Sequence, residues 1–198
     1  MAADKHFNQV SYNYDKKRSK GVLGYLVSRE MKMIINKLNP EKKDFILDAG
    51  CGSGFYSKII SYFNSKIFGI DLSENMIKIY NSNGFNGVVG NIENLPFKKR
   101  FNKVLCAGAL EFVIDPNKTI NSFNNVLKDN GEFILLYPRF NLFGLLYKIY
   151  HLMHNVKINL FSLNGIKGLL FNNGFKVVFI GKPNLLSGII VAVKYIDK

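Results

Sequence analysis

The chain has 198 residues, enough for one domain with a complete hydrophobic core. Its hydrophobic fraction of 47% is ordinary for a globular protein, and the absence of internal repeats and low-complexity tracts argues against a linker between domains. The net charge of +13 would suit RNA, DNA or a membrane surface, but the basic residues are spread along the chain, so compositional drift is the preferred explanation.

The first predicted element is an amphipathic helix over residues 20–38. Its apolar side chains recur at steps of mostly three and four residues, as they do on one face of a helix: Leu23, Leu26, Val27, Met31, Ile34, Ile35 and Leu38. Asn39-Pro40 ends the helix, because the residue before a proline is disfavoured in the helical region.

Short apolar strands then alternate with helices. The predicted strands cover residues 45–47, 66–70, 87–89, 103–107 and 133–137. The predicted helices are 54–63, one that Ser73 caps with Met76, Ile77 and Tyr80 on its inner face, and one that Asp115-Pro116 opens and Gly131 closes. Strands that alternate with helices predict a parallel sheet with helices on both faces.

The tail departs from this alternation. Ser162 can cap a helix that runs to Phe171 and ends at Gly174. Residues 175–180 and 189–195 then form two strands with only a loop between them, which fits antiparallel neighbours but is too short for a parallel crossover. The predicted fold is therefore α/β and Rossmann-like: a mostly parallel seven-stranded sheet, with helices on both faces and a C-terminal antiparallel hairpin.

The clearest local motif is the turn that follows the first strand, Asp48-Ala49-Gly50-Cys51-Gly52-Ser53-Gly54. Glycines here let the backbone turn tightly and approach a ligand without a Cβ clash. A dinucleotide fingerprint needs Gly-x-Gly-x-x-Gly, and neither register fits, because Phe55 and Ser57 occupy the last position. A P-loop is excluded as well, since no Gly-Lys-Ser/Thr follows.

Two polar segments follow the next two strands. Asp71 ends the second strand about 20 residues beyond the turn, where a carboxylate can accept hydrogen bonds from both ribose hydroxyls of an adenosine. Gly90-Asn91-Ile92-Glu93 follows the third strand, where a polar side chain and a backbone amide can read an adenine edge. The order and spacing of these parts predict a nucleoside site at the strand ends.

These parts resemble class I S-adenosylmethionine-dependent methyltransferases, from about Phe7 to the C-terminus. Further matches lie in three segments: Asn91-Ile92-Glu93-Asn94-Leu95-Pro96-Phe97 resembles the family's adenine loop, Val126-Leu127-Lys128-Asp129-Asn130-Gly131-Glu132 the segment before its fifth strand, and Asn173-Gly174-Phe175 its terminal Gly-Phe. The group that methylates small molecules, quinone precursors and lipids is the most similar. The resemblance implies one methyltransferase domain over residues 1–198, with 1–40 as an N-terminal helical cap.

The resemblance also implies a set of cofactor-binding residues. Gly50, Gly52 and Gly54 would line the methionine moiety of S-adenosylmethionine, with Asp48 near its amino group. Asp71 would hold the ribose, Leu72 and Met76 would pack on the adenine, and Asn91 and Ile92 would read its edge. Tyr14, in Tyr12-Asn13-Tyr14-Asp15, resembles the N-terminal tyrosine that folds over the cofactor. No metal ligand is implied, and no catalytic residue is named.

The sequence departs from the family pattern at two places. Asn91 stands where an aspartate is usual, so any bond to the adenine amine lacks charge assistance. Leu110-Glu111-Phe112-Val113 stands where many relatives have Leu-Glu-His-Val, which argues against metal-assisted O-methylation of a catechol. After the fourth strand, Cys106-Ala107-Gly108-Ala109 lacks the Asn/Asp-Pro-Pro-aromatic turn of enzymes that methylate amino groups of bases.

Other segments and residues allow more than one interpretation. Residues 140–161 are apolar nearly all round, which fits a lid over a lipophilic substrate, a helix resting on a membrane, or a core element. His151 and His154 are interpreted as surface or lid residues, because no carboxylate or cysteine lies nearby. Glu111 is either a general base or a loop carboxylate held by backbone amides.

The sequence also favours a cytoplasmic location. Cys51 and Cys106 are the only cysteines and do not form a Cys-x-x-Cys pair, which indicates a reducing compartment. Residues 1–6 hold no apolar run typical of a signal peptide. The longest apolar stretches, such as residues 185–193, fall short of the roughly 18 residues that span a membrane.

Three functions remain open at this level. The first is S-adenosylmethionine-dependent methyl transfer to a small molecule or a lipid by in-line displacement, which needs positioning more than a catalytic group. The second is RNA methylation that uses the basic surface, for which binding should weaken steeply with salt. The third is a non-catalytic module that binds the cofactor or a partner.

Overall fold

The computed structural model describes residues 21–195 of the chain. Its strands are β1 (Phe45–Ala49), β2 (Lys66–Asp71), β3 (Asn86–Val89), β4 (Phe101–Ala107), β5 (Leu127–Pro138), β6 (Phe175–Gly181) and β7 (Ser187–Lys194). Its helices are α3 (Gly21–Leu38), α4 (Phe55–Ile60), α5 (Glu74–Ser82), α6 (Pro116–Val126), α7 (Leu142–Met153) and α8 (Leu163–Asn172), with 3-10 turns η2 (Ser61–Phe63) and η3 (Leu110–Phe112). No helix within residues 21–195 has the length and apolarity to cross a membrane.

The strands form one sheet in the order β3-β2-β1-β4-β5-β7-β6. The pairs among β1 to β5 are parallel, whereas β7 runs antiparallel to both β5 and β6. The predicted fold class and the antiparallel hairpin at its end are thus confirmed. The chain first builds outward through β2 and β3 and then returns to β4, so β1 and β4 meet at a topological switch point, where α/β sheets bind ligands.

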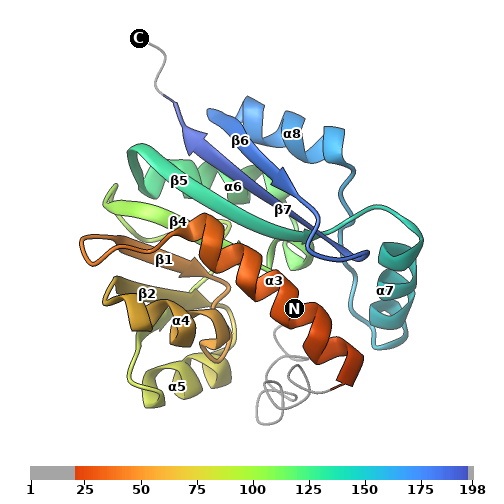
Figure 1. Cartoon of the computed structure of the whole chain (residues 1–198), viewed down its shortest axis with the longest axis horizontal. Coiled ribbons are helices and arrows are strands. Elements are labelled where there is room, and N and C mark those ends of the chain that lie inside the picture. Colours follow the sequence, from red (N-terminus) through yellow and green to blue (C-terminus); the bar gives the residue numbers. More distant parts are fainter. Residues whose placement is uncertain (1–20, 196–198) are drawn as a thin grey trace.

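Helices cover both faces of the sheet (Figure 1). On one face, Ile34 and Leu38 of α3 pack with Tyr56 and Ile60 of α4 against the strands. On the other face, α6 and α8 bury apolar side chains against the same strands: Ile120, Phe123, Ile166 and Leu170. Because each helix has its apolar side toward the sheet, the strands are held rigidly and their carboxyl ends make a fixed platform.

Local signals in the sequence account for most element boundaries. The Ser73 hydroxyl accepts a hydrogen bond from the Met76 amide at 3.2 Å and caps α5, and Asp115 caps α6 in the same way through the Lys118 amide at 3.0 Å. The predicted helix 54–63 divides into α4 and η2, since its last turn is 3-10 and Asn64 follows in the left-handed region. Ser162 caps α8 as predicted.

The prediction that Gly131 closes the helix opened by Asp115 is wrong. Helix α6 ends at Val126, and the fully buried Leu127 is already extended and pairs with Phe101 of β4. Gly131 instead lies within β5, where a Cβ would come 2.8 Å from the Lys128 carbonyl oxygen. Burial of Leu127 in the core ends the helix before the glycine is reached.

Candidate functional site

The glycine turn is formed by backbone bonds between neighbouring strands. The amides of Gly50 and Cys51 both donate to the Ile70 carbonyl, at 2.8 and 3.1 Å, which turns the chain sharply after β1. Gly50, Gly52 and Gly54 have φ angles of 76°, 52° and 95°, a region that favours glycine. The turn thus ends at Gly54, which is the N-cap of α4.

The glycines of this turn have different surroundings. A Cβ on Gly50 would lie 2.3 Å from the Cβ of Ala109, so the turn packs directly on the loop that follows β4. A Cβ on Gly52 would meet no atom of residues 21–195 within 4 Å. Gly52 therefore borders open space on the ligand side of the turn, whereas Gly50 is fixed by contact with the protein.

Asp71 lies at the end of β2 with its carboxylate against the turn. One oxygen, Oδ2, accepts from the Gly52 amide and the other, Oδ1, accepts from the Ser73 amide, each at 2.9 Å. Burial raises the pKa of this carboxyl, while the bonds from Ser73 and Gly52 oppose the rise. A carboxylate has about four acceptor positions, so Asp71 keeps capacity for the hydroxyls of a ligand.

The segment after β3 forms another wall. Asn91 is exposed and its side-chain oxygen accepts from the Glu93 amide at 2.9 Å, which closes a local turn. Ile92 is buried. The Glu93 carboxylate accepts from the Ile114 amide at 2.8 Å and so joins this wall to the loop after η3. The contact between Glu93 and Ile114 is not evident from the sequence.

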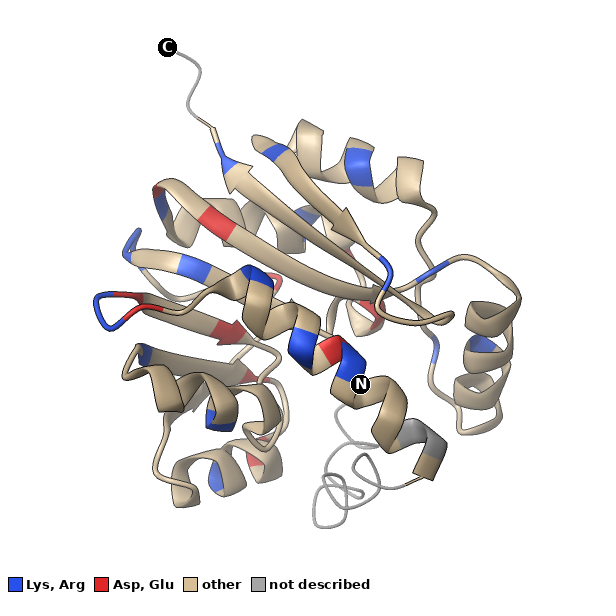
Figure 2. Ribbon diagram, in the orientation of Figure 1, with Lys and Arg blue, Asp and Glu red and all other residues tan. Residues whose placement is uncertain are grey.

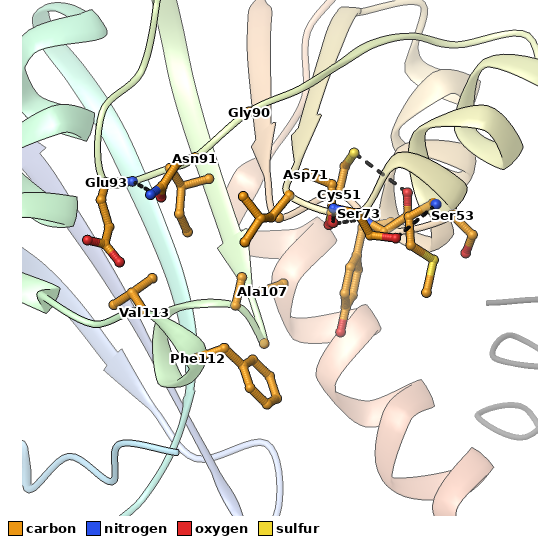
Figure 3. A pocket seen from close by; sticks show the side chains of 18 of the residues that line it. Cys51, Ser53, Asp71, Ser73, Gly90, Asn91, Glu93, Ala107, Phe112 and Val113 are labelled. Carbon is orange, nitrogen blue, oxygen red and sulfur yellow. Dashed lines mark hydrogen bonds between the residues drawn. The ribbon is translucent and has the colours of Figure 1, made fainter. Parts of the chain in front are cut away.

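These walls enclose one pocket at the carboxyl ends of the strands. Figure 3 shows Cys51, Asp71 and Ser73 on one side of it and Glu93 and Val113 on the other. The predicted residues that line it are Gly50, Gly52, Asp71, Leu72, Met76, Asn91 and Ile92. The structure adds Cys51, Ser53, Phe55, Tyr56, Ser73, Gly90, Glu93, Ala107, Gly108, Ala109, Phe112, Val113 and Ile114. Ala107 ends β4 and the residues from Gly108 onward follow it. The switch point between β1 and β4 is the feature of the fold that points to them.

Two of the predicted site residues that the structure describes, Asp48 and Gly54, do not line the pocket. Asp48 is buried beneath the turn, with 2% of its surface exposed. A Cβ on Gly54 would face the rings of Tyr80 and Phe85 instead of the pocket. Tyr14 lies outside the described residues.

The Asp48 carboxylate belongs to a buried polar network. It accepts from the Ser57 hydroxyl at 2.7 Å, and the Ser57 oxygen lies 2.8 Å from the Tyr80 hydroxyl oxygen. Burial raises the pKa of Asp48 to about 7, the charge of Asp71 adds to this rise, and the bond from Ser57 opposes it.

We expect Asp48 to make the stability of the ligand-free protein depend on pH. Between about pH 4 and about pH 7 the native state holds a proton that the unfolded state releases, so the free energy of unfolding falls as pH rises, by up to about 1.4 kcal/mol per pH unit. Asp48→Asn should reduce this fall, as measured by urea unfolding at about pH 5 and about pH 8. The exposed Asp129→Asn serves as the control. An unchanged pH dependence in Asp48→Asn would contradict the raised pKa of Asp48.

Phe112 connects the pocket with α7. The ring of Phe112 lines the pocket, and its centroid lies 5.4 Å from that of His151, which is buried on the inner side of α7. The sequence predicted surface or lid positions for both histidines; His154 is exposed, whereas His151 is buried on α7 within the predicted lid segment. Glu111 is buried beside Phe112, and its backbone carbonyl accepts from the Asn159 amide at 2.8 Å.

Comparisons with known proteins agree on one family. A family model described as a methyltransferase domain matches residues 47–135. An uncharacterized protein of Methanocaldococcus jannaschii is 30% identical over 87% of this chain and 78% of its own length. The ubiquinone/menaquinone biosynthesis C-methyltransferase of Wigglesworthia glossinidia brevipalpis is 34% identical over 73% of this chain, which spans only 62% of that relative.

Solved structures share the fold. A chain in the complex of the Haloferax volcanii Trm112 methyltransferase activator with a methyltransferase has a TM-score of 0.81 at 16% identity, over 96% of this chain and 97% of its own. Magnesium protoporphyrin IX methyltransferase from Synechocystis PCC 6803, with bound S-adenosylhomocysteine (SAH), has a TM-score of 0.75 at 18% identity. The match covers 97% of this chain and 98% of that methyltransferase. At these identities the likeness concerns the fold alone.

Proposed function

Because the chain belongs to the class I S-adenosylmethionine-dependent methyltransferases, we propose that it transfers a methyl group to a small lipophilic acceptor. The cofactor is S-adenosylmethionine, as the family requires. The observation that carries the choice of acceptor is the composition of the pocket. Its lining within residues 21–195 includes no Lys, Arg or His, and one of its walls consists of Phe112 at the end of η3 with Val113 and Ile114 after it.

The pocket fits this cofactor. The open space beside Gly52 allows the methionine portion to approach the backbone without meeting a side chain. The remaining acceptor capacity of Asp71 suits the two ribose hydroxyls. The buried Met76 offers an apolar surface for the adenine, and the segment of Asn91 and Ile92 lies at its edge.

A lipophilic acceptor suits the rest of the pocket better than RNA does. An RNA substrate carries phosphates that are bound through Lys and Arg, and the lining described above holds neither. The similar protein from Wigglesworthia is named for ubiquinone and menaquinone biosynthesis, which supports the same class of acceptor. We further propose that residues 140–161 act as the lid on the acceptor side, since His151 of α7 contacts Phe112.

The proposed mechanism relies on positioning. When bound, S-adenosylmethionine supplies a methyl group that its sulfonium has already activated for in-line displacement. Asp71 orients the ribose, and the close contact of Gly50 with Ala109 fixes the turn relative to the loop after β4. The bond from Ile114 to Glu93 holds the acceptor wall against the adenine wall. A protein base is needed only if the acceptor atom carries a proton of high pKa.

Radiolabelled cofactor tests the acceptor class. We expect label to pass to a hydroquinone that carries a prenyl tail, with kcat/KM at least about tenfold higher than for the same hydroquinone without the tail, since each buried methylene contributes about 0.8 kcal/mol. Asp71→Ala serves as the control for cofactor-dependent transfer. Label on RNA instead of the hydroquinones would contradict the proposal, and label on none of the acceptors would favour a binding module.

A further inference from the structure

Helix α7 presents apolar side chains to solvent on most of its surface. Its inner stripe is narrow and consists of Gly144, Tyr147 and His151, which lie at helical spacing. The remaining apolar residues are exposed, from 41% for Leu145 to 78% for Met153: Leu142, Phe143, Leu145, Leu146, Ile149, Tyr150, Leu152 and Met153. A continuous exposed apolar surface of this kind marks an interaction site.

The orientation of α7 is fixed by specific contacts. Asn141 caps the helix by accepting from the Gly144 amide at 2.9 Å, and its side-chain amide donates to the Leu185 carbonyl at 2.8 Å. A Cβ on Gly144 would lie 1.9 Å from the Arg139 carbonyl oxygen, so the first turn packs closely on the end of β5. The buried ring of His151 holds the last turn against Phe112. The apolar face is therefore held outward.

The stretch of chain that contains α7 carries basic residues and no acid between Glu132 and Asp197. Every Asp and Glu of the chain except Asp197 lies at or before Glu132. The stretch between these two residues carries only basic charges: Arg139, Lys148, Lys157, Lys167, Lys176, Lys182 and Lys194. In Figure 2 the ribbon of α7 shows no acidic residue.

We propose that the exposed face of α7, with Lys148 on it and Arg139 and Lys157 beside it, docks on the surface of an anionic lipid bilayer. Apolar side chains of an interfacial helix enter the boundary between headgroups and acyl chains, and nearby Lys and Arg are attracted to anionic headgroups. Both features occur together on α7, and no acidic side chain of the stretch opposes them. The proposal stands on this surface alone and does not depend on the identity of the acceptor.

Helix α7 lies between the proposed bilayer contact and the pocket. The His151 side chain lies on the inner side of α7, and its ring contacts that of Phe112, which lines the pocket. A bilayer on the exposed face of α7 would thus be separated from the Phe112 wall of the pocket only by this helix.

Two single-Trp variants test where the bilayer touches, because the chain contains no Trp. Ile149→Trp places the reporter on α7, and Phe171→Trp places a matched reporter on α8, at positions that are 54% and 67% exposed. With phosphatidylcholine vesicles that contain phosphatidylglycerol, we expect a blue shift of emission for Ile149→Trp only. No shift, or an equal shift in both variants, would overturn the proposal.

Vesicle co-sedimentation of the full chain measures the affinity. The double variant Leu146→Gln/Ile149→Gln should bind the anionic vesicles at least about tenfold more weakly, whereas Phe171→Gln should bind like the wild type. Binding should weaken at high salt, because the basic residues contribute through long-range attraction. Equal binding of the double variant, or self-association through α7 without vesicle binding, would overturn the proposal. Titration with SAH, which does not involve α7, tests the methyltransferase function separately.

Discussion

Asp71→Ala is expected to lower the affinity for SAH by about 100-fold or more, because it removes a buried carboxylate acceptor that charge-assisted bonds to the ribose would use. The same substitution removes the bond from the Gly52 amide, which helps to hold the glycine turn. Calorimetric titration of the ligand-free protein measures the loss directly.

Two control variants separate binding from folding in this experiment. Asp129 is an exposed carboxylate that pairs with Lys99, and Asp129→Ala should bind SAH like the wild type. Asp71→Asn keeps the shape of the side chain but loses its charge, so its affinity should lie between those of Asp71→Ala and the wild type. Affinity of Asp71→Ala within about threefold of the wild type would contradict the assignment of Asp71 to the ribose.

Gly50→Ala is expected to reduce both stability and cofactor affinity. Its φ of 76° strains any L-residue, and the new Cβ would lie 2.3 Å from that of Ala109. Strain and overpacking together should lower the free energy of unfolding by about 2–4 kcal/mol. Because the turn must move away from Ala109, we expect SAH to bind about 100-fold more weakly. Urea unfolding and calorimetry measure the two effects.

Gly52→Ala should reduce affinity with little further loss of stability. Gly84 is its matched control, because it also has a positive φ and no atom within 4 Å of a Cβ, yet it does not line the pocket. Both variants should lose about 1–2 kcal/mol of stability from backbone strain. Only Gly52→Ala should weaken SAH binding, by about tenfold or more, because its methyl group fills the space beside the turn. Equal affinities of the two variants would show that the ligand does not approach Gly52.

Much of the platform for the site was predictable from the sequence. The change of hydrophobic period, the capping Ser73 and Asp115, and the glycine turn are local signals that the structure keeps. The carboxyl ends of parallel strands meet at one edge of the sheet, so the order of the motifs was enough to bring Asp71 and Asn91 to one pocket.

The parts that were missed depend on contacts between distant segments. The bond from Ile114 to Glu93 joins two loops whose sequences give no sign of it. Asp48 is buried because Ser57 and Tyr80 pack with it beneath the turn. Helix α6 ends at Val126 because Leu127 is buried in the core. The sequence of α7 does not indicate which side faces outward, because apolar residues occur nearly all round the helix. Its orientation depends on the contacts of Asn141 and Gly144.

Calorimetric titration of the purified wild-type protein with SAH, with NAD as the control ligand, tests whether the pocket binds the methyltransferase cofactor. We expect saturable binding of SAH at one site per chain and no binding of NAD, whose fingerprint the turn lacks. An absence of SAH binding up to about millimolar concentration, or equal binding of NAD, would contradict the cofactor site described here.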